Sequence, residues 1–347
     1  MVSEYVNFKD MIHYLGLSQL RTLIQKIGFE TIMQGLEATI EEDFRQWEDF
    51  KNQPRHASHF NNGVIELMVT HTETKYSFKY VNGHPQNSLK HLLSVTGFGV
   101  LADAVTGYPI FLSEMTVLTA FRTAASSALA AKYLAKSNSR KMAIIGTGAQ
   151  SEFQALAFKS ILGITDFYIY DIDHKSMSKF HSNLSNNGIN ITLCSSLEEA
   201  IKCADIVTLC TTNLNREGLI KKHHLIPGQH YNAVGGDSPG KVEISKDALN
   251  QMSIFVELTD QTLNEGEIKQ LTKYDHVTEL WQVIQKKSVG RVNDAQITIF
   301  DSVGYAIEDF STLRFIYELA QKHDLLRTLD LIPDELGDPK NIFELIR

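Results

Sequence analysis

The chain has 347 residues, a length that exceeds one ordinary hydrophobic core and indicates two domains with a cleft between them. With 43% hydrophobic and 21% charged residues, its composition is that of a globular protein. The 33 basic and 41 acidic residues give a net charge of −8, which excludes a basic field for nucleic acid or an anionic membrane. Apolar runs are far shorter than the roughly 18–20 residues that cross a bilayer, and the N-terminus has no basic segment leading into an apolar one. A cytoplasmic protein is therefore expected.

The first third of the chain combines helical and strand patterns. Between residues 18 and 50, apolar residues recur at steps of three and four, which predicts one or two amphipathic helices. Residues 55–115 predict an antiparallel sheet, because segments rich in β-branched and aromatic residues alternate with turn chemistry. These segments are 64–70, 76–81, 94–102 and 108–112. Residues 116–135 are rich in alanine and predict a helix that connects the domains.

From residue 141 onward, apolar strands alternate with amphipathic helices. Strands are expected at 142–145, 167–170, 206–210, 231–234, 254–257 and 297–300, and helices at 152–162, 175–186 and 305–322. This alternation predicts a doubly wound parallel sheet of the Rossmann kind. We therefore expect an α/β protein whose Rossmann-like domain spans residues 122–317. A second, α+β domain that contains the antiparallel sheet is expected at residues 1–121, for substrate binding and dimerisation, and the C-terminal segment 318–347 is expected to join it.

The three cysteines, Cys194, Cys203 and Cys210, form no C-x-x-C pair. Neither a disulfide framework nor a zinc site is therefore predicted, and no metal is expected. Because free cysteines are usually buried, all three are predicted to be small core residues.

A nucleotide site is predicted where the first strand of the parallel sheet meets its helix. Gly146 and Gly148 match the first two glycines of the G-x-G-x-x-G pattern, and Ser151 stands at the third. The helix N-terminus after them offers unpaired N–H groups to a pyrophosphate. Asp171 ends the second strand, about 20 to 25 residues further on, where an acid accepts from ribose hydroxyls and repels a 2′-phosphate. NAD is therefore favoured over NADP, although Asp171 is also suited to capping the following helix.

The predicted antiparallel region carries charges at unusual positions. Arg55 precedes it, Glu66 lies within Val-Ile-Glu-Leu-Met, and Lys79 lies within Ser-Phe-Lys-Tyr-Val. Charges in strands usually mark the solvent face of a sheet, which is the alternative interpretation. Arg122 lies in a helix of small and apolar residues, where a guanidinium is costly unless an anion pairs with it. Together, the three cations are candidates for holding a carboxylate.

Asp237 is the first candidate for catalysis. It follows a short β-like run that ends in Gly235-Gly236 and precedes Ser-Pro-Gly-Lys. A strand that ends in two glycines and a carboxylate is typical of an α/β sheet that delivers an acid to the crevice beyond its strand ends. The alternative is an ordinary surface turn, whose composition is similar.

Over roughly residues 50–315, the chain resembles the ornithine cyclodeaminase and mu-crystallin family. The matching segments are 63–68, 78–85, 99–103, 114–125, 148–154, 233–241 and 300–304. Two positions differ from the family pattern, since Ser94 stands where threonine is usual and Ser238 where cysteine is usual. Ser94 keeps the hydroxyl group of threonine. Ser238 replaces a thiol with a hydroxyl next to Asp237, a change that concerns selectivity for the substrate side chain.

The resemblance implies a role for each matching residue. Arg55, Lys79 and Arg122 would bind the substrate α-carboxylate, with Lys79 also counted among the catalytic residues. Glu66 would lie beside the reacting α-amino group, and Asp237 would be the acid/base for the side-chain amine, with Val303 lining the substrate. The implied NAD-contacting positions are Ser94, Arg122, Gly146, Gly148, Ala149, Gln150, Asp171, Thr211, Tyr231, Asn232, Ala233, Val234, Lys241 and Ser302.

The activity implied by the resemblance is conversion of L-ornithine to L-proline and ammonia, with tightly bound NAD recycled within each turnover. Lysine cyclodeaminase remains an alternative, because one methylene changes preference by only about 1–3 kcal/mol. An NAD(P)-dependent alanine dehydrogenase or ketimine reductase would need no acid for a distal amine, so the intact Gly-Gly-Asp run favours the lyase. A non-catalytic binding protein would have no reason to keep the buried charged set. The many apolar strands of the first domain, like the family, imply a homodimer.

Overall fold

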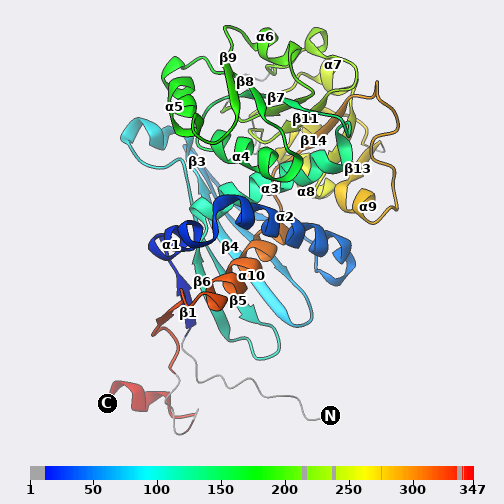
Figure 1. Ribbon diagram of the computed structural model, residues 1–347. Helices are drawn as coiled ribbons and strands as arrows, with labels where there is room; N and C mark the ends of the chain where they lie inside the picture. The colour runs from blue at the N-terminus through cyan, green and yellow to red at the C-terminus, as the bar shows by residue number, and fades with distance from the viewer. Residues whose placement is uncertain (1–11, 213–216, 237–239, 275, 334–337, 339) are drawn as a thin grey trace.

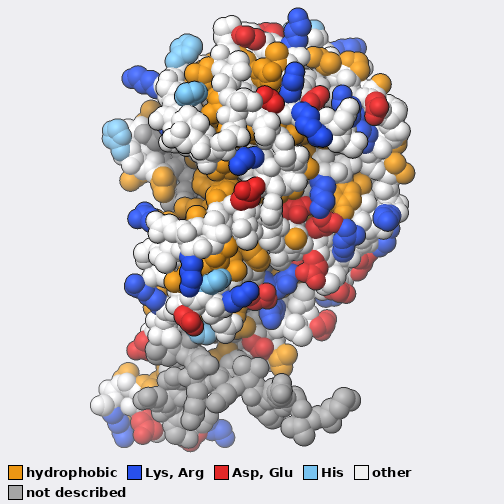
Figure 2. Space-filling model, viewed as in Figure 1, with side chains coloured by type: hydrophobic (Ala, Val, Ile, Leu, Met, Phe, Trp, Pro, Cys, Tyr) orange, Lys and Arg blue, Asp and Glu red, His pale blue; other side chains and the backbone are white. Residues whose placement is uncertain are grey.

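The computed structural model describes residues 12–212, 217–236, 240–274, 276–333, 338 and 340–347. Two lobes, each built on one sheet, lie at the bottom and the top of Figure 1. Asp237 and Ser238 lie outside the described residues. In the described ranges, no helix combines the length and apolarity that a membrane span requires. On the face shown in Figure 2, Lys and Arg side chains are interspersed with Asp and Glu rather than gathered in one basic area.

The first lobe contains a sheet of seven strands among the described residues, in the order β15-β1-β6-β5-β4-β3-β2. Its strands are β1 (Ile12–Leu15), β2 (His56–Phe60), β3 (Gly63–His71), β4 (Lys75–Gly83), β5 (Val95–Asp103), β6 (Pro109–Glu114) and β15 (Arg327–Leu329). The pairs from β2 to β6 are antiparallel, which confirms the predicted antiparallel region. β1 differs because it runs parallel to β6.

One face of this sheet is covered by helix α10 (Ala306–Lys322), which packs on β3, β4, β5 and β6. Helix α2 (Phe29–Arg45) packs against α10 in turn, and α1 (Leu17–Ile27) precedes it (Figure 1). The 3-10 turns η1 (Trp47–Asp49) and η2 (Pro85–Lys90) also belong to this lobe, and η5 (Ile342–Ile346) lies apart from it near the C-terminus (Figure 1). Leu36, Ile40 and Phe44 of α2 are fully or almost fully buried, as the helical periodicity of the sequence requires.

The second lobe contains an eight-stranded sheet among the described residues, in the order β13-β12-β14-β11-β10-β7-β8-β9. Its strands are β7 (Lys141–Ile145), β8 (Asp166–Tyr170), β9 (Asn190–Leu193), β10 (Ile206–Leu209), β11 (His230–Ala233), β12 (Ser253–Val256), β13 (Val277–Glu279) and β14 (Thr298–Asp301). All neighbouring pairs are parallel, as predicted. The chain order reverses between β7 and β10, which is the switch point where such sheets bind ligands.

Helices flank this sheet and connect the lobes. They are α3 (Thr116–Leu134), α4 (Ser151–Leu162), α5 (His174–Leu184), α6 (Leu197–Lys202), α7 (Lys246–Leu249), α8 (Thr259–Glu265) and α9 (Leu280–Ile284), with η3 (Lys222–His224) and η4 (Glu267–Gln270). Helix α3 packs on α2 and α10 of the first lobe and on α4, β11 and β14 of the second. The predicted connecting helix therefore lies between the lobes.

The contacts of α10 bear on the predicted domain boundaries at 121/122 and 317/318, which remain predictions. Because α10 packs against the strands of the first lobe, its contacts favour a return of the chain to that lobe near residue 305.

The prediction for the cysteines was wrong in part. Cys194 is buried, but Cys203 is exposed and Cys210 is only half-buried. Cys203 directly follows the short helix α6, where a small residue meets solvent as readily as the core.

Candidate functional site

The charged residues of β3 and β4 lie on the buried face of their sheet. Along β3, Val64, Glu66 and Met68 are buried in alternation with more exposed neighbours, and along β4 the buried positions include Ser77 and Lys79. Because side chains alternate between the two faces of a strand, both charged groups point toward α10 rather than toward solvent. The solvent-face interpretation of Glu66 and Lys79 is therefore excluded.

Arg55 connects the first lobe to the loop after β14. Its Nη1 donates to Glu66 Oε2 at 3.0 Å, and its Nε lies 3.3 Å from Glu265 Oε2 at the end of α8. Its Nη2 donates to the carbonyl oxygens of Val303 and Gly304 at 2.5 and 2.6 Å. The side chain is only 5% exposed, so these contacts replace the hydration that a guanidinium has in water.

Lys79 and Arg122 share a carboxylate. Lys79 Nζ donates to Asp309 Oδ1 at 2.7 Å, and Arg122 Nε donates to the same oxygen at 3.1 Å. Arg122 Nη1 also donates to Glu308 Oε2 at 2.8 Å. A Cβ added to Gly304 would overlap with Arg122 Nη1, so the guanidinium lies against the backbone that Arg55 binds from another side. The structure thus brings Arg55, Lys79 and Arg122 together.

Burial shifts the pKa values within this cluster. It lowers the pKa of the Lys79 ammonium to about 8, the nearby Arg122 adds to the decrease, and the Asp309 carboxylate opposes it. Burial also raises the pKa of Glu308 to about 7, against the opposing charge of Arg122. Burial thus moves both pKa values toward neutral pH, a shift that is common at functional sites.

Sequence reasoning missed the acidic partners of the cations. They are Glu257, Glu265, Glu308 and Asp309, all of them buried. The adjacent acids of Ala-Ile-Glu-Asp-Phe, within a helix predicted to be amphipathic, were a signal for two of them. Glu257, at the end of β12, accepts from Ser302 Oγ at 2.6 Å and from Gly304 N–H at 3.0 Å, and it thereby holds the segment that contains Val303.

The predicted nucleotide site has the expected local geometry. Gly146 has φ +91°, and a Cβ there would lie 2.8 Å from the Cys210 carbonyl oxygen, so the tight turn requires glycine. Helix α4 begins after Gln150 without a side-chain cap, and the Gln150 Oε1 atom is buried with no hydrogen-bond partner in the described structure. The start of this helix, which no side chain caps, suits a pyrophosphate.

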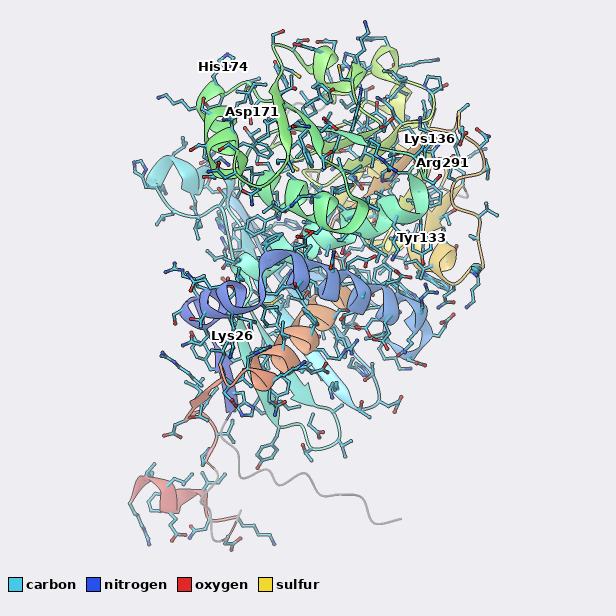
Figure 3. The ribbon with its side chains drawn as sticks, viewed as in Figure 1. Lys26, Tyr133, Lys136, Asp171, His174 and Arg291 are labelled. Atoms are coloured by element: carbon cyan, nitrogen blue, oxygen red, sulfur yellow. The ribbon has the colours of Figure 1, made fainter. Side chains whose placement is uncertain are left out.

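Asp171 lies at the carboxyl end of β8, just before the helix that starts at His174 (Figure 3). Its Oδ2 accepts from Thr147 N–H at 2.6 Å and Thr147 Oγ1 at 2.9 Å, which fixes it beside the glycine turn. The capping alternative is wrong, because the residue that caps α5 is Asp173, through Lys175 N–H at 2.9 Å. Its other oxygen, Oδ1, accepts from Asp173 N–H at 2.9 Å, and contact of Asp171 with ribose hydroxyls stays a prediction.

Some of the other predicted cofactor positions follow the ends of strands, whereas others are buried within a strand. Thr211 follows β10, Val234 follows β11 and Ser302 follows β14, so all three are at carboxyl ends of neighbouring strands. The predicted positions Tyr231, Asn232 and Ala233 are fully buried within β11 itself. The Tyr231 hydroxyl donates to Gln229 and the Asn232 amide to Thr208, so cofactor contact by these side chains stays a prediction.

The remaining predicted cofactor positions lie outside the strands of the parallel sheet. Ala149 follows Gly148 in the loop before α4, Lys241 is buried, and Ser94 precedes β5 in the first lobe. The Ser94 hydroxyl is 3.5 Å from the Pro85 carbonyl oxygen. Their contact with a cofactor also stays a prediction.

Two buried glutamates hold the glycines that precede Asp237. Glu243 Oε2 accepts from Gly235 N–H at 2.8 Å, while its Oε1 accepts from Thr211 N–H at 2.8 Å. A Cβ on Gly236 would lie 2.5 Å from Glu267 Oε1, and one on Gly235 would lie 2.2 Å from the Thr211 carbonyl oxygen, so the backbone at Gly235 requires glycine. The backbone that leads to Asp237 is therefore tied to the loop after β10.

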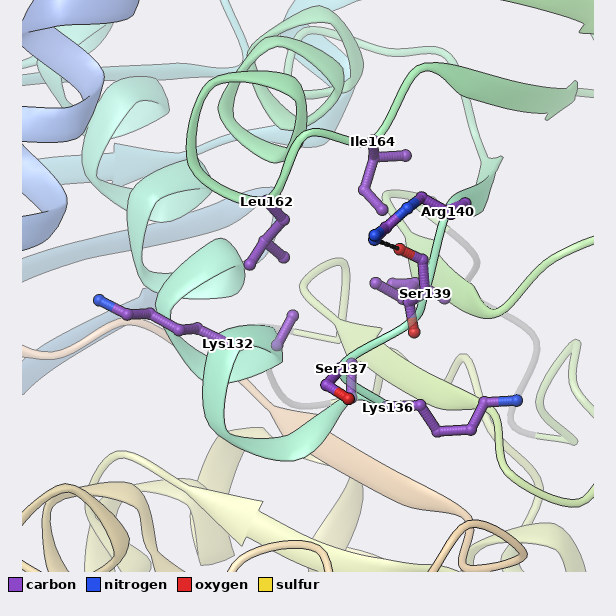
Figure 4. Close-up of a pocket in the computed structure, with 10 residues that line it drawn as sticks. Lys132, Lys136, Ser137, Ser139, Arg140, Leu162 and Ile164 are labelled. Carbon is purple, nitrogen blue, oxygen red and sulfur yellow. Dashed lines mark hydrogen bonds between the residues drawn. The ribbon is translucent and has the colours of Figure 1, made fainter.

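Two cavities differ in how close they lie to the cluster of Arg55, Lys79 and Arg122. One, of about 320 Å³, lies between residues 54–59 and α8 and is lined by Arg55 and Glu265. The other, of about 160 Å³, lies at the end of α3 (Figure 4). Its Lys132 and Lys136 side chains point away from each other (Figure 4), and Lys132 forms ion pairs with Glu37 and Glu41. The first cavity adjoins the candidate site, and the second does not.

Comparison with known proteins decides the family. The model of the ornithine cyclodeaminase/mu-crystallin family matches residues 19–324. The chain is a member of this family. An ornithine cyclodeaminase of Agrobacterium tumefaciens (strain Ach5) is 48% identical over 337 residues, which cover 97% of this chain and 94% of that protein.

Solved structures of similar fold agree with this family membership. An archaeal alanine dehydrogenase dimer with bound NAD has a TM-score of 0.85 and 30% identity, covering 92% of this chain and 99% of that one. A lysine cyclodeaminase structure has a TM-score of 0.89, covering 96% and 99% of the two chains. At 24% identity, the latter shows the shared fold alone.

Proposed function

We propose that this member of the ornithine cyclodeaminase/mu-crystallin family is a cyclising ammonia-lyase, which converts L-ornithine to L-proline and ammonia with NAD as its cofactor. The observation that carries the proposal is the convergence of Arg55, Lys79 and Arg122 in a buried cluster between the lobes. We infer that this cluster, the clamp, binds the substrate α-carboxylate. The 48% identity to an ornithine cyclodeaminase over almost the whole chain supports ornithine as the substrate.

The described residues fit NAD. The glycine turn, the uncapped start of α4 and the fixed Asp171 carboxylate lie along the carboxyl edge of β7 and β8. When bound, NAD would supply reversible oxidation at the substrate Cα. The chain's own residues would bind the pyrophosphate through the N–H groups of α4 and the ribose through Asp171.

Proton transfer at the side-chain amine is assigned to Asp237. An alkyl ammonium has a pKa of about 10.4, and its protonated form is not a nucleophile. A carboxylate within hydrogen-bond reach would hold the ammonium and accept its proton. The free amine would then attack Cα while that carbon is at the oxidation level of an imine, and the α-nitrogen would leave as ammonia. Ring closure within one molecule draws on the roughly 7–11 kcal/mol that orientation provides over a bimolecular attack. The clamp would contribute by holding the other end of the substrate, with Glu66 beside its α-amino group and Val303 against its side.

Product analysis tests this function. Purified protein is incubated with L-ornithine, L-lysine or L-alanine and substoichiometric NAD, and ammonia, amino-acid products and NADH absorbance are followed together. We expect proline and ammonia from ornithine in amounts that exceed the NAD added, without accumulation of NADH. Stoichiometric NADH from alanine would indicate a dehydrogenase, and preferential pipecolate formation from lysine would indicate a lysine cyclodeaminase.

We also propose that the first sheet pairs with a second copy of the chain. Large apolar side chains are exposed on its strands, including Phe60, Leu67 and Phe98. The archaeal alanine dehydrogenase of similar fold is a dimer. Sedimentation at micromolar concentration should give a dimer, and a monomer there would contradict the proposal.

A cytoplasmic location of the protein stays a prediction from the sequence.

Replacing Asp171 with Ala should weaken NAD binding by about 10- to 100-fold, since hydrogen bonds to a charged group contribute about 1.5–3 kcal/mol. The preference for NAD over NADP should also fall, because the carboxylate no longer repels a 2′-phosphate. Fluorescence titration with NADH and NADPH measures both effects. Asp173→Ala is the matched control, since it removes the cap of α5 and leaves Asp171 in place. Equal losses of NADH affinity in the two variants would contradict the assignment.

A further inference from the structure

Asp309 on α10 joins two of the three buried cations of the clamp. Its Oδ1 accepts from Lys79 Nζ at 2.7 Å and from Arg122 Nε at 3.1 Å. Lys79 lies on β4 and Arg122 on α3, so one oxygen links a strand of the first sheet to the helix between the lobes. Lys79 is 0%, Asp309 1% and Arg122 5% exposed, so water contributes little to their solvation.

The shared oxygen opposes a repulsion. Two cations that bond to the same atom lie close together, and their repulsion is strong where the effective dielectric constant is low. Burial and Arg122 both lower the pKa of Lys79, whereas Asp309 raises it through its charge and its hydrogen bond. Loss of the Asp309 charge would therefore let the cations separate and would favour the neutral form of Lys79.

We propose that Asp309 is a positioning residue that sets the spacing of Lys79 and Arg122 for the substrate α-carboxylate. The inference rests on the proposed function, which assigns both cations to that carboxylate. A carboxylate has two oxygens at a fixed distance, so its affinity depends on donors held at a matching distance. Asp309 acts through the cations and needs no contact with the substrate. The effect should therefore extend to any α-amino acid that binds this site, whatever its side chain.

The charge of Lys79 depends on groups from several elements. Asp309 and Glu308 belong to α10, Arg122 to α3, Arg55 to the segment before β2, and Glu66 to β3. Among the causes of its pKa shift, Asp309 is the anion that raises the pKa, while Arg122 and Arg55 lower it. Removing Asp309 therefore lowers the pH above which Lys79 is uncharged.

The test is Asp309→Asn in the enzyme loaded with NAD. The KM for ornithine should rise on the order of tenfold, with a smaller change in kcat, because a charge-assisted hydrogen bond to each cation is weakened. The alkaline limb of the kcat/KM profile should move to lower pH. Calorimetry should show weaker binding of L-proline as well.

Asp43→Asn is the matched control. Asp43 is buried, accepts from Arg314 Nη2 at 2.8 Å, and so forms an ion pair between α2 and the same helix α10 without touching the clamp. This variant should lose stability while keeping the wild-type KM and alkaline limb. If Asp309→Asn does not fold, Asp309→Glu replaces it, because its charge is retained while its oxygen is displaced. Asp309→Glu should raise the KM for ornithine and leave the alkaline limb of the pH profile in place. An unchanged KM would overturn the proposal.

The outcomes separate this inference from the proposed function. Normal proline formation with an unchanged KM and limb in Asp309→Asn would refute the positioning role and leave the function intact. A wild-type enzyme that makes no proline, but whose affinity for L-alanine or L-lysine falls in Asp309→Asn, would refute the function and support the positioning role. If the wild-type holoenzyme bound none of these amino acids, both would be wrong.

Discussion

Replacing Asp237 with Asn is expected to reduce the kcat for proline formation by about 10²- to 10⁴-fold, the usual contribution of a general base. The amide keeps the size of the side chain and cannot accept the proton of the δ-ammonium. NAD affinity should not change, because the glycine turn and Asp171, which are assigned to the cofactor, belong to other loops. Ammonia release measures turnover, and NADH fluorescence measures cofactor binding.

The control for this variant is Asp260→Asn, which changes an exposed carboxylate at the start of α8. It should retain wild-type turnover. Near-normal proline formation by Asp237→Asn would remove Asp237 from the mechanism. The hydrogen bond from Gly235 N–H to Glu243 fixes the backbone two residues before Asp237.

Replacing Arg122 with Met is expected to destabilise the protein by about 3–5 kcal/mol and to abolish measurable turnover of ornithine. The substitution leaves Asp309 and Glu308 buried without their shared cation. The pKa of Glu308, already raised to about 7 by burial, should rise further without Arg122. A carboxyl with a raised folded-state pKa loses stability as pH rises toward that pKa, so the defect should be larger near about pH 8 than near about pH 6. Urea unfolding at both pH values measures it.

Arg45→Met provides the comparison for an exposed arginine. Arg45 pairs with Glu41 on the surface of α2, where such pairs contribute about 0.2–1 kcal/mol. We expect a loss within that range and unchanged activity. Equal free energies of unfolding for Arg122→Met and Arg45→Met would show that the Arg122 ion pairs contribute no more than a surface pair.

Local sequence patterns were sufficient for the architecture and for part of the site. Alternation of strands and helices after residue 141 predicted the parallel sheet, since period and turn chemistry are properties of neighbouring residues. The same holds for the glycine turn at Gly146, whose positive φ is a local requirement. The cost of burying a charge also identified Arg122 as a residue that needs a partner.

The sequence by itself determined which residue types are present and where they lie along each strand or helix. Only the tertiary structure decided which of them meet: Asp309 lies 230 residues from Lys79 and 187 from Arg122 along the chain. No local period encodes such a pairing, because it depends on α10 returning across the first sheet after the whole parallel sheet has been built. The partners of the buried cations are therefore a consequence of topology, whereas the need for them follows from the energetic cost of an unpaired buried charge.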